Sequence, residues 1–170
     1  AAIRLLFSFV LENRLANKDE QEILAKYVGW GGLSDVFDST KSNWANEYTE
    51  LKSLLSDGEY AQARESTLTA FYTPPIVIDS IYSILDNLGF KYGNILEPAC
   101  GTGNFLGRLP HQMKDCKLYG IELDSITGRI AKQLYQKANI TVDGYENTNL
   151  PDSFFDVAIS NVPFGQFKVS

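Results

Sequence analysis

The sequence predicts an α/β fold in which an N-terminal helical segment precedes a mostly parallel sheet. From "AFYTPP" (residues 70–75) onward, short apolar and β-branched runs alternate with helical stretches, which is typical of βα units. Before that point, apolar residues such as Leu5, Leu6 and Phe9 recur at helical spacing. We therefore divide the chain into a helical segment, residues 1–66, and an α/β domain, residues 67–170.

The helical segment is expected to hold four helices. The second begins after the cap Asn17 and carries Ile23, Leu24 and Tyr27, and "GWGGL" (29–33) ends it, because three glycines in four residues do not fit a helix interior. "WANEYTELKSLL" and "DGEYAQARESTL" follow as two helices separated by Asp57-Gly58. Trp30, between glycines, is expected to be a buried aromatic that fixes the turn rather than an exposed docking residue.

The α/β domain is expected to begin with a helix over residues 76–88, opened by Pro74 and Pro75. A shorter helix begins at "GNFLGRL", and a third, "SITGRIAKQLYQKA", is expected to have a serine cap. Four strands are expected, at "GNILEP", "KLYGIEL", "NITVDG" and "FFDVAIS".

Composition limits the possible functions. The chain has 170 residues, a net charge of −6, two cysteines and one histidine, so a structural zinc site or any other metal centre is not expected. No apolar stretch is long enough to span a bilayer and the N-terminus lacks the features of a secretory signal, which makes the cytoplasm the default location. A module that grips DNA alone is usually basic, so any grip on nucleic acid must come largely from elsewhere in a longer protein.

A glycine loop and an acidic strand end together predict a nucleoside site. "EPACGTGNF" (97–105) lies where the first strand passes into a helix, and Gly101 and Gly103 let the backbone turn tightly beside a ligand. The N–H groups of the following helix would favour a negatively charged part of that ligand. Glu122 ends the second strand 21 residues after Gly101, and a carboxylate at this spacing can accept hydrogen bonds from both ribose hydroxyls.

The dinucleotide fingerprint G-x-G-x-x-G does not fit, since Leu106 stands at the third glycine position and Gly107 comes one residue later. The loop instead resembles motif I of S-adenosylmethionine-dependent methyltransferases that act on amino groups, and Glu122 resembles the acid of their motif II. "FYTPP" (71–75) resembles the motif that precedes motif I, and "DGYENTNLP" (143–151) lies where their third motif contacts the adenine of the cofactor.

These motifs resemble those of adenine-specific DNA methyltransferases of the restriction–modification type. In particular, the chain is similar to the methylase-like domains of large helicase–methylase proteins of phages and conjugative elements, in which a GWGGL-type helical prelude recurs. The resemblance implies a Rossmann-like methyltransferase sheet and S-adenosylmethionine as the cofactor. The residues that it assigns to cofactor binding are Phe71, Tyr72, Thr73, Glu97, Pro98, Ala99, Gly101, Thr102, Gly103, Asn104, Phe105, Glu122, Leu123, Tyr145 and Glu146.

"NVPF" (161–164) occupies the place of the catalytic motif, which is usually Asn-Pro-Pro-Tyr or Asn-Pro-Pro-Phe. The resemblance implies that Asn161 Oδ1 and the backbone carbonyl of Val162 accept hydrogen bonds from the amino group of adenine, and that Phe164 stacks on the flipped base. Val162 replaces a proline and loses its fixed φ, but it keeps the carbonyl, and Pro163 still favours an extended residue 162. We therefore interpret the change as tolerated rather than as a decayed remnant or a chance strand-ending turn.

Two other functions remain open. The domain could be a non-catalytic scaffold module of a DNA-processing or anti-restriction protein, which the acidic charge, Val162 and the helical prelude would also suit. It could also be a protein glutamine-amide methyltransferase, because such enzymes share an Asn-Pro-Pro-Tyr clamp.

The predicted sheet is expected to be a truncated one. A complete fold of this kind has seven strands, and only about four precede residue 170, so we expect a fragment that is inactive alone and lacks the target-recognition part. DNA would then be bound through parts of the parent protein, with no membrane partner. The exposed sheet edge could pair two copies into a homodimer.

Overall fold

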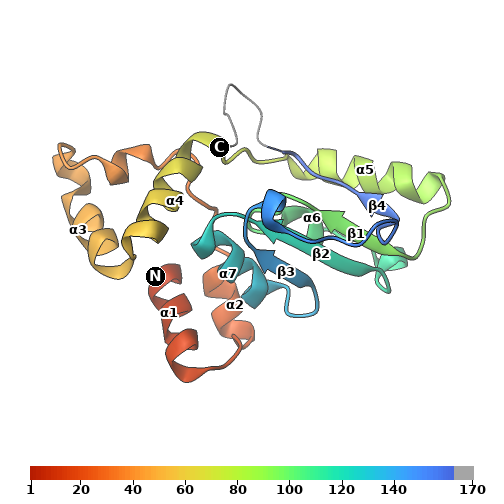
Figure 1. Cartoon of the computed structure of the whole chain (residues 1–170), viewed down its shortest axis with the longest axis horizontal. Helices are drawn as coiled ribbons and strands as arrows, with labels where there is room; N and C mark the ends of the chain where they lie inside the picture. Colours follow the sequence, from red (N-terminus) through yellow and green to blue (C-terminus); the bar gives the residue numbers. More distant parts are fainter. Residues whose placement is uncertain (163–170) are drawn as a thin grey trace.

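A computed structural model describes residues 1–162, apart from the side chain of Val10, and confirms the predicted α/β fold (Figure 1). Helices alone fill the first part of the chain, and helices alternate with strands in the second. Short 3₁₀ turns connect several elements. The helices and strands are α1 (Ala2–Glu12), α2 (Lys18–Leu24), α3 (Ala45–Leu54), α4 (Asp57–Thr69), α5 (Pro75–Asn87), β1 (Asn94–Glu97), α6 (Asn104–Gly107), β2 (Lys117–Glu122), α7 (Ser125–Leu134), β3 (Asn139–Val142) and β4 (Val157–Ala158).

The four strands form one parallel sheet in the order β3-β2-β1-β4. The register sets Glu97 at the end of β1 opposite Gly120, and Glu122 at the end of β2 opposite Val142. The order reverses direction between β1 and β4, since β2 and β3 extend to one side of β1 and β4 to the other. In open parallel sheets, ligands bind beyond the carboxyl ends of the strands at such a switch point.

Helices α5 and α7 cover the same face of the sheet. Ile78 and Tyr82 of α5 pack with Ile95 of β1, while Ala131 of α7 packs with Ile140 of β3. Leu118 of β2 contacts both clusters, and side chains alternate along a strand, so these contacts all lie on one face.

The opposite face carries an aromatic cluster. Tyr119 projects from that face of β2, and its ring centroid lies 5.4 Å from that of Phe154 and 5.3 Å from that of Phe155, both in edge-to-face geometry. The segment that leads into β4 therefore covers part of this face of the sheet.

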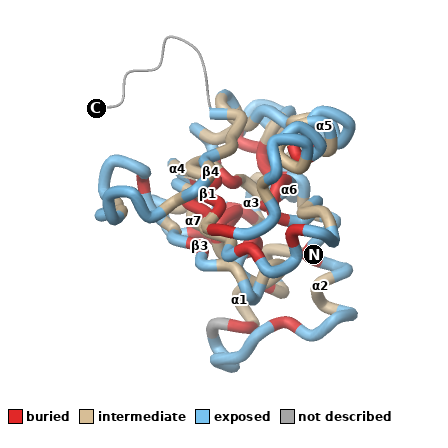
Figure 2. The backbone as a smooth tube through the Cα atoms, turned by 90° about the vertical axis from the view of Figure 1, so that its right-hand side faces the viewer, coloured by how far each residue is buried: buried red, intermediate tan, exposed pale blue. Residues whose placement is uncertain are grey.

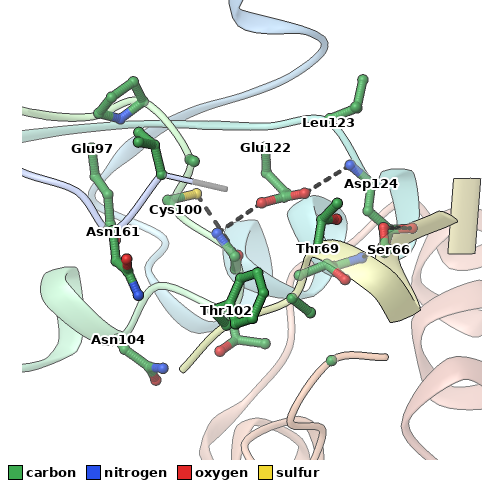
Figure 3. A pocket seen from close by; sticks show the side chains of 18 of the residues that line it. Ser66, Thr69, Glu97, Cys100, Thr102, Asn104, Glu122, Leu123, Asp124 and Asn161 are labelled. Atoms are coloured by element: carbon green, nitrogen blue, oxygen red, sulfur yellow. Dashed lines mark hydrogen bonds between the residues drawn. The ribbon is translucent and has the colours of Figure 1, made fainter. Parts of the chain in front are cut away.

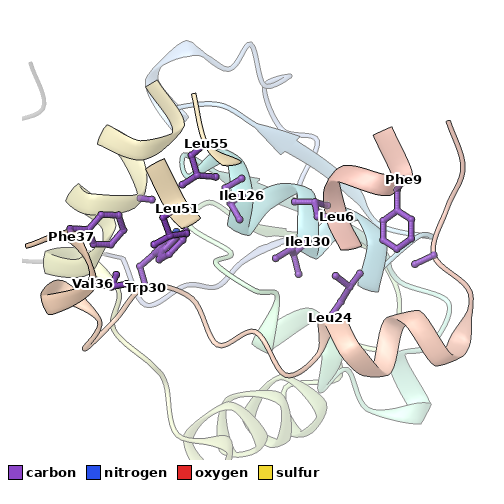
Figure 4. Packing of buried hydrophobic residues seen from close by; sticks show 12 residues of the cluster. Leu6, Phe9, Leu24, Trp30, Val36, Phe37, Leu51, Leu55, Ile126 and Ile130 are labelled. Atoms are coloured by element: carbon purple, nitrogen blue, oxygen red, sulfur yellow. The ribbon is translucent and has the colours of Figure 1, made fainter. Parts of the chain in front are cut away.

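Helix α7 is shared between the sheet and the helical segment. Its Ile126 and Ile130 are fully buried in a cluster with Leu6, Leu24 and other residues of the first part of the chain (Figure 4). Polar contacts reinforce this packing: Ala16 N donates to Gln133 Oε1 at 2.8 Å, and Gln21 Nε2 donates to Gln133 O at 2.7 Å. Figure 2 shows that buried backbone gathers toward the middle of the molecule.

Several local expectations are wrong in detail. Asp57-Gly58 does not separate two helices but forms the first turn of α4, because Ser56 and Glu59 make a capping box there. Helix α2 ends at Leu24, before Tyr27. The cap of α7 is Asp124, whose side chain accepts from Thr127 N at 2.7 Å, and not the serine that follows it.

The expectation for Trp30 holds. This residue is 3% exposed, which confirms a buried aromatic. Among the described residues, no helix combines the length and apolar character needed to cross a bilayer. The boundary at residue 66 falls inside α4, so the two-part division stays a proposal.

The shared position of α7 predicts that the two parts of the chain unfold together. Ile130→Ala removes a fully buried side chain that packs against the helical segment, and should lower the free energy of unfolding by about 3 kcal/mol in one transition. Urea denaturation followed by circular dichroism measures this. The control is Ile84→Ala on α5, where the side chain is 58% exposed and the loss should stay below about 1 kcal/mol. Two separate transitions in the unmutated chain would contradict the prediction.

Candidate cofactor and catalytic site

A cavity of about 420 Å³ lies beyond the carboxyl ends of the strands, at the switch point of the sheet. Its walls come from the loops after β1, β2, β3 and β4, and from the segment that joins α4 to α5 (Figure 3). The helical segment adds residues 28–30 and Ser66 to the lining. Elements from both parts of the chain therefore enclose one space.

The loop after β1 makes a tight turn at the floor of this cavity. Gly103 N donates to Cys100 O at 2.8 Å, and Gly103 has φ 85°, a left-handed conformation that favours glycine. A Cβ on Gly103 would also collide with the ring of Tyr135, which packs against the turn from α7's end. The expected helix follows as α6, but it is a single turn of four residues, so its dipole offers little attraction for a negatively charged group.

Glu122 points back to this turn. Gly101 N donates to Glu122 Oε2 at 2.8 Å and Asp124 N donates to Glu122 Oε1 at 2.8 Å, as the dashed lines in Figure 3 indicate. Burial raises the pKa of Glu122, against these backbone hydrogen bonds, which lower it. Each oxygen keeps a further lone pair, so the carboxylate is fixed in orientation and can still accept from a ligand.

Glu97, at the end of β1, is the other acid of the floor. It is 3% exposed, and its Oε2 atom has no hydrogen-bond partner among the described residues. Burial, together with the nearby charge of Glu122, raises its pKa to about 9. A buried polar atom without a partner is costly, and a ligand that donates a hydrogen bond or brings positive charge would satisfy it.

The charge of the lining is one-sided. Of the described residues that line the cavity, none is lysine, arginine or histidine. Four acidic residues, Glu122, Asp124, Asp143 and Glu146, line it together with Glu97, which keeps its proton up to about pH 9. An anionic ligand such as a pyrophosphate would be repelled here, and a cationic one attracted.

The start of the predicted catalytic motif reaches the same cavity. Asn161 and Val162, which follow β4, both line it, and Val162 is 53% exposed. Pro163 and Phe164 lie outside the described residues. The order β3-β2-β1-β4 thus brings residue 161 beside Glu97, because β4 and β1 are neighbours in the sheet.

The structure gathers nearly all of the predicted cofactor residues around this cavity. The exception is Gly103, which is not in the lining but supports it by its turn and its contact with Tyr135. Sequence reasoning missed the lining residues Val28, Gly29, Trp30, Ser66, Thr69, Ala70, Cys100, Asp124, Thr127, Asp143 and Gly144. Asp124 could have been suspected from its position two residues after Glu122, whereas nothing local points to Val28 or Thr69.

A parallel sheet with a glycine turn after β1 and a fixed carboxylate at the end of β2 defines the class of nucleoside-binding α/β domains. The chain belongs to the N-6 DNA Methylase family, whose model matches residues 53–168. This membership confirms the predicted resemblance to S-adenosylmethionine-dependent, adenine-specific DNA methyltransferases.

Curated relatives match between about half and nearly all of this chain. Defense against restriction protein B of Escherichia phage P1 is 26% identical over 166 residues, which are 96% of this chain and 6% of the phage protein. Type II methyltransferase M.CvrRI of Paramecium bursaria Chlorella virus XZ-6E is 32% identical over 94 residues, which are 55% of this chain and 24% of that protein. The chain therefore spans only a minor part of these relatives.

Among solved structures, a putative class I S-adenosylmethionine-dependent methyltransferase from Listeria monocytogenes is similar, with a TM-score of 0.46 and 21% identity. The match covers 98% of this chain and 60% of that one.

The raised pKa of Glu97 predicts a pH dependence of stability. The unfolded chain releases this proton near the ordinary value of 4.5, whereas the folded chain keeps it to about pH 9. Folding takes up a proton in that window, so the free energy of unfolding should fall as the pH rises from 4.5 to 9, by up to about 1.4 kcal/mol per pH unit. Glu97→Gln has no proton to lose and should flatten this fall in urea denaturation at pH 5 and pH 8.

The matched control is Glu47→Gln, which removes one carboxyl from the first turn of α3, away from the cavity. It measures the general effect of one negative charge fewer. An equal flattening in both variants would contradict the role of Glu97.

Proposed function

We propose that the chain is the cofactor-binding and catalytic-motif part of a DNA methyltransferase, which transfers a methyl group from S-adenosylmethionine to the exocyclic amino group of adenine. The observation that carries this proposal is the acidic lining of the cavity, with no basic side chain among its described residues. The methyl donor carries a sulfonium, an ammonium and one carboxylate group, so its net positive charge matches this lining, whereas the negative charge of a dinucleotide does not.

The described residues fit such a cofactor. Glu122, held by two backbone N–H groups, offers its free lone pairs to the two ribose hydroxyls. Glu97 Oε2, buried and without a partner among the described residues, would accept a hydrogen bond from the ammonium group, whose positive charge favours the ionised carboxylate. Leu123, Tyr145 and Glu146 form the part of the lining where the adenine ring would lie.

The bound cofactor supplies an electrophilic methyl group. Two hydrogen-bond acceptors of this chain act on the adenine that receives it. The adenine nitrogen is a poor nucleophile because its lone pair is delocalised into the ring. Asn161 Oδ1 and the carbonyl of Val162 can accept hydrogen bonds from its two hydrogens, which favours a pyramidal nitrogen with its lone pair toward the methyl group. After the transfer the nitrogen becomes neutral again by losing one of these two hydrogens as a proton. Phe164 would stack on the flipped base, by the resemblance alone.

The proposed substrate is duplex DNA with one base turned out of the helix. The chain has a net charge of −6 and the lining of its cavity is acidic, so parts of the parent protein outside this chain would hold the phosphates. A DNA substrate also agrees with the cytoplasmic location that we propose.

Asn161→Ala should separate binding from chemistry. In the full-length protein, methyl transfer to adenine-containing DNA should fall by at least about 100-fold, because one of two acceptors is lost, while the dissociation constant of S-adenosylmethionine changes by less than about threefold. Radiolabelled methyl transfer and calorimetric titration measure the two quantities. In the matched variant Glu122→Ala, the affinity for S-adenosylmethionine should fall instead.

The same assay tests the other two functions. Wild-type protein that binds the cofactor but labels no nucleic acid contradicts the proposal. Absence of any heat of cofactor binding would favour the non-catalytic scaffold, and label in protein rather than DNA would favour glutamine-amide methylation.

The edge of the sheet supports a proposal of self-association. Strand β4 is only two residues long, and among the described residues it pairs with β1 alone. An unpaired strand edge can pair with another chain, so we expect dimers at high concentration. Size-exclusion chromatography with light scattering that shows only monomer would contradict this.

A further inference from the structure

Trp30, which stands between glycines in the helical segment, lines the cavity beside its acidic floor. Trp30 is 3% exposed, and its ring packs edge-to-face with those of Tyr27 and Phe37, at centroid distances of 5.8 and 5.4 Å. Figure 4 shows Trp30 beside Phe37. Its indole Nε1 donates to Asp124 Oδ1 at 3.2 Å. The packing therefore aims a single polar atom of this residue at one buried carboxylate.

Asp124 connects this tryptophan to Glu122. The Asp124 side chain is 2% exposed, and the backbone N–H of the same residue donates to Glu122 Oε1 at 2.8 Å. Thr127 N shares Asp124 Oδ1 with the indole, at 2.7 Å, and Ser66 Oγ approaches Oδ2 at 3.5 Å. Because both the side chain and the backbone of Asp124 are engaged, the orientation of its N–H, and with it the position of Glu122, depends on these donors.

The loop around Trp30 also presses against the wall of the cavity. A Cβ on Gly31 would lie 2.9 Å from Ala70 O and 3.1 Å from a ring carbon of Tyr72. Both Ala70 and Tyr72 line the cavity. A side chain at position 31 would therefore displace the wall. Burial of Trp30 alone does not require a glycine at position 31, whereas this close contact with the cavity wall does.

We infer that Trp30 is a positioning residue for the ribose-binding carboxylate: through Asp124 it fixes Glu122 in the orientation that receives the two ribose hydroxyls. This inference rests on the proposed function, since it assumes a nucleoside in the cavity. It makes the helical segment part of the nucleoside site, although Trp30 itself need not touch the reacting atoms.

A purely structural role predicts something different. Trp30→Phe keeps an aromatic ring in the cluster and removes the indole N–H, so packing alone would lower stability and leave ligand selectivity intact. A positioning role instead lowers the contribution of the ribose hydroxyls to binding. Selectivity between adenosine and 2′-deoxyadenosine separates the two, because these ligands differ by one hydroxyl that Glu122 would accept from.

The experiment is an NMR titration of the 170-residue chain with both nucleosides, which measures weak dissociation constants. The unmutated chain should prefer adenosine by about tenfold, the value of one hydrogen bond to a charged group. In Trp30→Phe the preference should fall to about twofold. In Glu122→Gln it should be equally small, and adding Trp30→Phe to that variant should change it no further.

Trp44→Phe is the matched control, since Trp44 packs at the edge of the same hydrophobic cluster and does not line the cavity. It should keep the tenfold preference. An unchanged preference in folded Trp30→Phe overturns the inference while leaving the proposed function standing. Absence of adenosine binding by the unmutated chain overturns both.

A second measurement covers the case that Trp30→Phe does not fold. The chain has two tryptophans, so in Trp44→Phe the only indole N–H resonance is that of Trp30. Saturating adenosine should shift this resonance, and saturating 2′-deoxyadenosine should shift it distinctly less. Equal shifts would overturn the inference.

Discussion

A buried carboxylate that must have its oxygens satisfied organises this chain. Asp124 is almost completely excluded from solvent, and its partners come from the turn after α2, from the end of α4 and from the first turn of α7. A buried carboxylate oxygen that loses a hydrogen bond costs about 1–3 kcal/mol, so these donors favour a fixed position of the helical segment on the sheet. The same residue caps the helix that both parts of the chain pack against. The side chain of Asp124 therefore caps α7, contacts the helical segment and forms part of the cavity floor.

The elements could be predicted from the sequence to the extent that their signals are local. The alternation of β-branched runs with helical stretches predicted the four parallel strands, and the glycine turn and Glu122 were predicted to lie together, as they do at the cavity. The errors concern competition between nearby residues for one role. Ser56 caps helix α4 just before Asp57-Gly58, so the helix begins at the dipeptide that was expected to interrupt it. Asp124 rather than Ser125 caps α7. In both cases a side chain at the preceding position satisfies a free N–H group of the first turn.

What the sequence could not provide are contacts between distant residues. Trp30 and Asp124 are 94 positions apart, and the burial of Trp30 was predictable while its hydrogen-bond partner was not. Gly103 was expected to make room for a ligand, yet the room beside it is filled by Tyr135. In both cases the residue type indicates that another group packs closely against it, and only the three-dimensional fold determines which group that is. A single sequence carries the first kind of information and not the second.

The one-sided charge of the cavity has a consequence for turnover in the reaction that we propose. Its carboxylates attract a sulfonium, and they have one positive charge fewer to hold once methylation has left a neutral thioether. The acidic lining that favours binding of S-adenosylmethionine therefore binds the demethylated product more weakly, which favours its release. Electrostatics alone would then give the cycle a forward bias, with no lid or hinge needed to expel the by-product.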